Sequence, residues 1–297
     1  MTTRDCLHRR LAGGFFVLGL VLALAGAACA ETFTFTTNTA ISISDTTYDN
    51  MDIVVQGCTL TVDGAHAFNS LTLERNASNV PGVVTHSPGA SGLNLTVTGD
   101  VAVQGADGEL VASRIDVSGK GSLSETGAGA GGNGTSYGGG AGYGGLGAGG
   151  IGGSVGGVAY GSILQPADLG SGGGKGGANL GGPGGGCLRL QAAGVLTLNG
   201  TIRADGTTVS HAGGGGAGGS IWLTAGALAG SGLVTADGAT PGSANAGSGA
   251  GGRIAIYFGT NAFAGAVSAK GGINRIGGAG TIYTRSEAAS YGSLLVD

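Results

Sequence analysis

Several residue types are scarce in this chain of 297 residues. It has four cysteines, five prolines and one tryptophan, with 5% aromatic and 10% charged residues. The net charge is −4, and nucleic acid is excluded as a partner because clustered lysines and arginines are needed to bind phosphates. No long apolar run follows the first 30 residues, which excludes a membrane span there. Zinc-type Cys/His spacings, HExxH and G-x-S-x-G are also missing, so we expect no metal and no cofactor.

The first 30 residues are typical of a secretory signal peptide. Three arginines precede an apolar run over residues 15–25, and small residues precede a cleavage site near Ala30. The apolar run is too short to cross a bilayer. The mature protein is therefore predicted to be secreted or at the cell surface. Its net charge would be −6.

What the chain has in abundance is glycine, with 70 residues, alternating with short β-rich runs. Over residues 31–118 these runs recur about every ten residues and alternate apolar with polar side chains, as in TLTV (59–62) and LNLTV (93–97). Neighbouring runs have equal lengths and the same inward residue types, which favours stacked turns of a solenoid over a sandwich. No segment of useful length after the leader has a helical period.

Residues 187–297 contain four glycine-rich repeats of one design. Each has a first strand (CLRL, SIWLTA, RIAIYF, TIYT) and a shorter second one (TIRADG, LVTADG, AVSAKG, SLLVD). Repeats of about this length mark units that bury their apolar faces only when stacked. When the repeats stack, side chains at equivalent positions should line up across the strands, and the inward-facing ones should form two columns in the core. In the first strands the inward residues are Leu188/Leu190, Ile221/Leu223, Ile254/Ile256 and Ile282. In the second strands they are Ile202/Ala204, Val234/Ala236, Val267/Ala269 and Leu294/Val296. Because the repeat breaks off at Asp297, we expect the chain to be a fragment of a longer protein.

Between these parts, residues 119–186 form a glycine-rich insertion. Glycine recurs there at intervals of three, for example at 144, 147, 150, 153 and 156. Three residues make one turn of a polyproline II helix, and glycine on one face lets such helices approach closely. Three outcomes are open: a packed bundle of polyproline II segments, a flexible loop, or further β-strands. The fold class is thus all-β, a right-handed parallel β-helix or solenoid with this insertion.

Candidate catalytic groups are sparse. The histidines after the leader (His66, His86 and His211) lie far apart in turn-like contexts and are expected to be solvated. Asp205 and Asp237 should stack in one outward column, where carboxylates could hold calcium. Lys270 fills the third position of that column, so we expect a structural role. Polysaccharide lyases use clusters of acidic residues with arginine or lysine, and Asp205, Asp237 and Arg203 are fewer than such a cluster contains. We therefore predict no enzymatic activity.

The outward positions of the first strands are more suggestive. Trp222 and Tyr283 occupy equivalent positions, aligned with Arg189, while Tyr257 and Arg285 share the next column. Aromatic rings beside arginine can stack on sugar rings. Alternatively, the glycine-rich insertion covers them and they are buried with cation–π support. Glycan stacking on Trp222, Tyr257, Tyr283 and Arg285 is the binding hypothesis, and burial is its competitor.

Cys58 and Cys187 are the cysteines left after the leader. Export permits a disulfide, yet no framework pattern supports one, and we expect either two unpaired thiols or an incidental bridge. By the alternation of its strand, Cys187 should point outward.

The blocks YGSILQPADLGSGGG (160–174), GGSIWLTAGALAGSGLVTADG (218–238) and GAGTIYTRSEAASYGSLLVD (278–297) resemble a glycine-rich, β-helical module of large secreted or cell-surface bacterial proteins. The resemblance covers roughly residues 113–297 and implies an extracellular, non-catalytic, adhesin-like region without known site residues. The predicted function is therefore structural or adhesive, with cell-surface polysaccharide or other copies of the chain as partners. Two alternatives stay open: a carbohydrate-binding or polysaccharide-degrading β-helix, and an ice- or surface-binding protein.

Overall fold

Two long β-sheets, and glycine-rich segments that extend beyond them, make up the protein. The computed structural model describes residues 30–106 and 111–297, so the predicted leader lies outside the described residues. Every regular element of this part is a β-strand. None of its segments forms a helix of the length and apolar character that crossing a membrane requires. The all-β class predicted from the sequence is confirmed.

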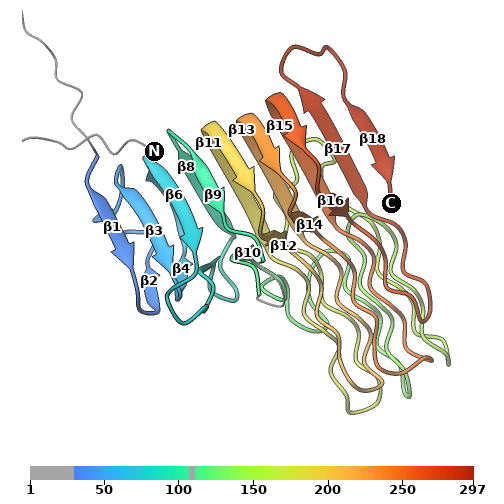
Figure 1. Cartoon of the computed structure of the whole chain (residues 1–297). Coiled ribbons are helices and arrows are strands. Elements are labelled where there is room, and N and C mark those ends of the chain that lie inside the picture. The colour runs from blue at the N-terminus through green and yellow to red at the C-terminus, as the bar shows by residue number, and fades with distance from the viewer. Residues whose placement is uncertain (1–29, 107–110) are drawn as a thin grey trace, which may run out of the picture.

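The larger sheet has eleven strands (Figure 1). They are β1 (Thr32–Phe35), β3 (Asp52–Gln56), β5 (Gly64–Phe68), β6 (Ser70–Glu74), β8 (Leu93–Val97), β9 (Val101–Val103), β11 (Cys187–Leu198), β13 (Ser220–Gly230), β15 (Arg253–Phe263), β17 (Thr281–Ser286) and β18 (Ser293–Val296). The smaller sheet has seven: β2 (Thr39–Ile41), β4 (Thr59–Val62), β7 (Val83–Thr85), β10 (Arg114–Asp116), β12 (Thr201–Arg203), β14 (Leu233–Thr235) and β16 (Ala266–Ser268). All pairs are parallel except β17 with β18.

The first strands of the four repeats stand side by side in the predicted register. Leu188 pairs with Ile221, Ile221 with Ile254, and Ile254 with Ile282. All four side chains are at least 95% buried and belong to one continuous core, which residues of both sheets share. Strand alternation alone explains this column, because it directs every second side chain to the same face.

The second strand of the fourth repeat differs from the prediction. We expected 293–297 to stack on β16 and to bury Leu294 and Val296. Instead β18 folds back against β17 as an antiparallel strand, and Leu294 and Val296 are 51% and 64% exposed. The apolar pattern of this strand does not specify a partner, and the chain pairs it with the free edge of β17.

The insertion 119–186 forms a hydrogen-bonded bundle together with the loops that join the repeats. In Figure 1 its green segments lie among yellow to red segments beyond the strands. It contributes no strand to either sheet, so the outcome of further β-strands, one of the three left open, is wrong. Residues 138–143 form its buried centre. They hydrogen-bond to six surrounding segments, which include residues 129–132, 148, 157–160, 174, 212–215 and 247–250.

The hydrogen bonds of this centre advance by three residues at a time. Gly138 N–H donates to the Ala212 carbonyl and Ala141 N–H to the Gly215 carbonyl, while Gly247 and Ala250 donate to the carbonyls of 138 and 141. Glycine is required where segments touch, since a Cβ at Gly139 would overlap the Val155 carbonyl oxygen. A flexible loop would not show such a network, so that outcome is wrong for the described insertion.

Candidate functional site

The predicted binding residues project from the outer face of the larger sheet, where the long strands of the repeats lie side by side. Trp222 on β13 pairs with Arg189 on β11 and Ala255 on β15, and Ala255 pairs with Tyr283 on β17. The next outward column places Tyr257 beside Arg285. The columns run across the strands, so a ligand that follows either column would lie crosswise to the strands.

Three of the four predicted residues line one depression, which we call the aromatic groove. It has a volume of about 340 Å³ and is lined by Leu164, Gln165, Trp222, Thr224, Tyr257, Arg285 and Glu287. Tyr283 does not line it, but its ring lies tilted against that of Tyr257, with 5.8 Å between centroids. The turn before β18 covers Tyr283, because a Cβ at Gly292 would overlap its ring.

Cation–π contacts order the side chains along the groove. The Arg189 guanidinium carbon lies 4.4 Å from the Trp222 ring centroid, and that of Arg285 lies 5.1 Å from the ring of Tyr257. Such contacts are worth about 0.5–1 kcal/mol at exposed sites. Arg189 Nε and Trp222 Nε1 are buried and make no hydrogen bond within the described residues. The groove therefore offers the rings of Trp222 and Tyr257 together with the exposed guanidinium group of Arg285.

The glycine-rich insertion forms one rim of the groove without closing over it. The Tyr257 hydroxyl donates to the Leu164 carbonyl at 2.7 Å, and burial raises the pKa of Tyr257. Trp222, Tyr257 and Tyr283 are half-buried, and Arg285 is exposed. The geometry thus lies between the two alternatives of an open stacking platform and a covered core.

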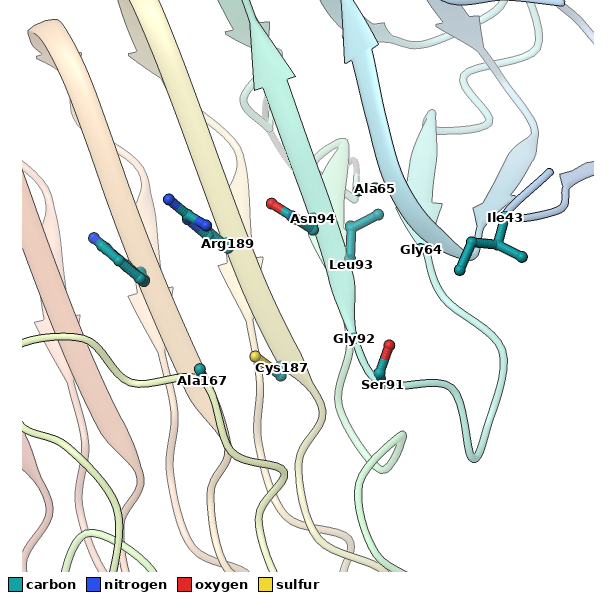
Figure 2. A pocket seen from close by; sticks show the side chains of 11 residues that line it. Ile43, Gly64, Ala65, Ser91, Gly92, Leu93, Asn94, Ala167, Cys187 and Arg189 are labelled. Atoms are coloured by element: carbon teal, nitrogen blue, oxygen red, sulfur yellow. The ribbon is translucent and has the colours of Figure 1, made fainter. Parts of the chain in front are cut away.

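Two further depressions continue the groove over the same face of the sheet. One of about 350 Å³ shares Trp222 and is lined by Arg189, Asn94 and Cys187 (Figure 2). Another of about 450 Å³ shares Thr224 and Glu287 and reaches residues 96–98, at the end of β8. The picture shows Arg189 and Asn94 on neighbouring strands, with Ala167 of the insertion near Cys187. Together they provide an extended surface suited to a polymer.

The outward-facing column that includes Cys187 is buried, which the sequence did not reveal. It continues through Ser220, Arg253 and Thr281. These side chains leave the main core, as expected, but all four are at least 94% buried because the insertion packs over them. Burial raises the pKa of the Cys187 thiol to about 11. Cys58 and Cys187 are both free.

A polar cluster joins the insertion to the sheet at this column. Arg253 donates from Nε to the Tyr160 carbonyl at 2.8 Å and from Nη1 to the Thr281 hydroxyl at 3.2 Å, and its guanidinium carbon lies 5.6 Å from the Tyr143 ring centroid. The hydroxyls of Tyr143 and Ser220 are hydrogen-bonded to each other, and Ser220 donates to the Asp168 carbonyl. Burial lowers the pKa of Arg253 and raises that of Tyr160 to about 12. The cluster anchors the insertion and has no counterpart in any sequence motif.

The aspartate column is on the smaller sheet, away from the aromatic groove. Asp205 accepts the Asp237 N–H at 2.8 Å, and Asp237 in turn accepts the Lys270 N–H at 2.7 Å. Each carboxylate therefore holds the backbone of the next repeat, which is the structural role expected. No group of three or more potential metal-binding side chains occurs in the described part of the chain.

The histidines lie elsewhere than expected. His211 is exposed, but His66 on β5 is 4% exposed with Nδ1 3.1 Å from Asp49 Oδ1, and His86 after β7 is fully buried. The expectation that all three are solvated is wrong for two of them. His66 lies within β5 and His86 directly follows β7, so both belong to strand segments that their turn-like sequence context conceals.

His86 should make stability depend on pH. Its Nδ1 lies 2.9 Å from the Ser87 carbonyl oxygen, its Nε2 has no partner, and burial lowers the pKa of His86 below the ordinary 6.5 despite nearby Asp63. The unfolded chain then binds the proton more readily than the folded one. The free energy of unfolding should therefore fall as pH drops below about 6.5, by up to about 1.4 kcal/mol per pH unit.

Urea denaturation between pH 7.5 and 5 would measure this effect. We expect His86→Leu to flatten the pH dependence, while His211→Leu, at an exposed position, should retain it. Equal slopes in both variants would show that His86 does not titrate as the burial predicts.

Compared with protein-family models, curated proteins and solved structures, the chain has no match in any of the three. The residues and their geometry therefore carry the functional argument.

Proposed function

We propose that the protein is an exported, non-catalytic structural or adhesive protein of the cell exterior, whose aromatic groove binds polysaccharide. The observation that carries this proposal is the pair of outward columns in which Arg189 stacks on Trp222 and Arg285 on Tyr257. Aromatic rings offer apolar faces to the C–H surface of a sugar ring, and arginine offers several donors to its hydroxyl or carboxylate oxygens.

The architecture we propose is a right-handed parallel β-solenoid. Parallel pairing runs through both sheets up to β17, and from β10 to β17 the chain passes alternately from one sheet to the other. A parallel crossover within a sheet is right-handed in about 98% of cases. A solenoid of this kind suits a structural or adhesive role because it presents equivalent residues of successive turns in straight columns.

In the same proposal, the insertion and the repeat loops form a bundle of polyproline II segments. Hydrogen bonds that advance by three residues, and glycines whose Cβ would overlap neighbouring backbone, support it, since this helix has three residues per turn. The bundle gives one edge of the groove a firm support at Leu164, through its bond to Tyr257.

Polysaccharide degradation is the alternative that the groove supports less well. Glycoside hydrolysis ordinarily uses two carboxyl groups on either side of the scissile bond. Glu287 is the one carboxylate among the residues that line the aromatic groove. Asp205 and Asp237 are engaged with backbone donors of the other sheet.

The test is retention of the protein on insoluble polysaccharides, with the supernatant analysed for released sugar. We expect binding without release, and we expect Trp222→Ala to weaken binding about tenfold, since aromatic stacking is worth about 0.5–1.5 kcal/mol. Tyr291→Ala is the matched control, because Tyr291 is 89% exposed and lies outside the groove.

Thermal unfolding of the same variants separates the two roles of Trp222. Weaker binding at an unchanged melting temperature supports the groove. A large loss of stability together with unchanged binding would show that Trp222 is a packing residue, and release of oligosaccharides would refute the non-catalytic assignment.

A further inference from the structure

Two arginines of the larger sheet differ from the others in how their charge is paired. Within residues 30–106 and 111–297, the arginines that are paired with a protein carbonyl or carboxylate oxygen are Arg75, Arg114, Arg203, Arg253 and Arg275. The remaining two, Arg189 and Arg285, lie over aromatic rings and have no such partner among these residues. Arg189 is half-buried with its Nε covered, and Arg285 is exposed. A guanidinium group has five N–H donors and no acceptor, so the donors that reach the surface are free to bind oxygen atoms of an anionic ligand.

The two arginines lie in depressions that together form one long hollow across the larger sheet. The depression that holds Arg189 (Figure 2) and the aromatic groove that holds Arg285 share Trp222. Their lining residues come from six neighbouring strands: β5, β8, β11, β13, β15 and β17. Five strand spacings of about 4.8 Å make this hollow about 24 Å long. We call the two depressions together the arginine trough, and its length fits several units of an extended polymer.

The arginine trough is positively charged on a protein that is negatively charged as a whole. The described residues that line it include two arginines and one carboxylate, that of Glu287, which gives a net charge of +1, whereas the chain has a net charge of −4. The strands of Arg189 and Arg285 are three spacings apart, or about 14 Å. One small anion reaches only one of the two side chains, whereas a polymer with carboxylates along its length reaches both.

We propose that the arginine trough binds a linear polysaccharide whose sugars carry carboxylate groups and which lies crosswise to the strands. The inference rests on the polysaccharide-binding function proposed above and names the class of its ligand. The rings of Trp222 and Tyr257 contact the C–H faces of the sugars. Arg285 binds a carboxylate through two parallel N–H···O bonds, the geometry for which the planar guanidinium group is suited. A neutral polysaccharide makes the first kind of contact and lacks the second.

Binding of the intact protein to polygalacturonate and to its methyl ester tests this ligand class. The two polymers share one backbone, and esterification removes the negative charges. We expect polygalacturonate to bind at least tenfold more tightly at low salt, as measured by biolayer interferometry. In about 1 M NaCl the difference should shrink, because charges are screened over about 3 Å.

Arg285→Gln identifies the residue responsible. We expect this variant to lose about tenfold in affinity for polygalacturonate and to keep its affinity for the methyl ester, since only the charged ligand loses a charge-assisted hydrogen bond. Lys175→Gln is the matched control, because it removes the same charge at an exposed position outside the trough and should leave both affinities unchanged.

The outcomes separate this inference from the function on which it rests. Equal or tighter binding of the methyl ester would overturn the carboxylate class and leave polysaccharide binding in place. Retention on insoluble neutral polysaccharides alone would do the same. Failure to bind any of these polymers would refute both proposals. Equal losses in Arg285→Gln and Lys175→Gln would show that the overall charge, and not the arginine trough, determines the affinity.

Discussion

Replacing Gly139 with valine should prevent the protein from reaching its native state. Gly139 lies in the buried centre of the bundle, where its N–H donates to the Gly132 carbonyl and its carbonyl accepts from Gly174. A Cβ there would overlap the Val155 carbonyl oxygen and crowd the Gly132 nitrogen. Both obstacles are backbone atoms that are themselves hydrogen-bonded, so they cannot rotate away as a flexible side chain could.

We expect a loss of about 4 kcal/mol or more, at the exceptional end of single-substitution effects. Set against a total stability of about 5–15 kcal/mol, this is enough to leave much of the protein unfolded or aggregated. Gly139→Ala should be severe as well, because the overlap begins at Cβ. Thermal and urea unfolding, together with the soluble yield, would measure the effect.

Gly152→Ala is the matched control. A Cβ at Gly152 meets no atom within 4 Å, and its positive φ of 90° carries the main penalty. For a residue with a Cβ this conformation costs about 1–2 kcal/mol. If Gly139→Ala proved as mild as Gly152→Ala, the close packing of the central segment would be refuted.

Replacing Arg253 with alanine should have the second largest effect, with a loss of about 3 kcal/mol. The substitution leaves the Tyr160 carbonyl and the Thr281 hydroxyl without their donor and opens a cavity beside the Tyr143 ring. Each buried polar group left unsatisfied costs about 1–3 kcal/mol. Burying the charged guanidinium group also costs free energy in the wild-type protein, and the substitution removes this cost. The expected loss of stability is therefore smaller than the sum of the separate penalties. In a protein of this size, the melting temperature should fall by roughly 6–12 °C.

Arg285→Ala provides the comparison, because Arg285 is exposed and its cation–π contact is worth at most about 1 kcal/mol. Its melting temperature should stay near that of the wild type. Limited proteolysis adds a specific readout: loss of the Arg253 anchor should expose 160–170 to cleavage before the β-sheets. An Arg253→Ala variant with wild-type stability and cleavage pattern would show that the polar cluster does not anchor the insertion.

The strand pattern was the most predictable part of this protein. Alternation within SIWLTA and RIAIYF places Ile221 and Ile254 in one buried column and Trp222 in the adjacent outward column, as the register shows. The three-residue glycine spacing likewise indicated close segment contacts. Both are local periodicities, and a periodicity can be read from one sequence because it determines which side chains share a face.

The direction in which strands pair, and which outward side chains are covered by other segments, could not be predicted in the same way. The apolar pattern of SLLVD is compatible with a parallel or an antiparallel neighbour. In the structure this strand pairs antiparallel with the free edge of β17. Cys187 and Arg253 point away from the main core as alternation requires, yet residues far away in the sequence, such as Tyr143 and Tyr160, cover them. That covering also gives the aromatic groove its rim at Leu164.

By itself, then, the sequence determined the all-β character, the inward and outward columns of the repeats, and the glycine positions that permit close approach. The tertiary structure alone decided which outward columns reach solvent and which are covered. The physical reason is that alternation assigns a side chain to a face of its own strand, whereas exposure depends on whatever packs against that face. Here the covering segment is separated from Arg253 by 93 residues at Tyr160 and by 110 at Tyr143, and no local pattern encodes a contact over that distance.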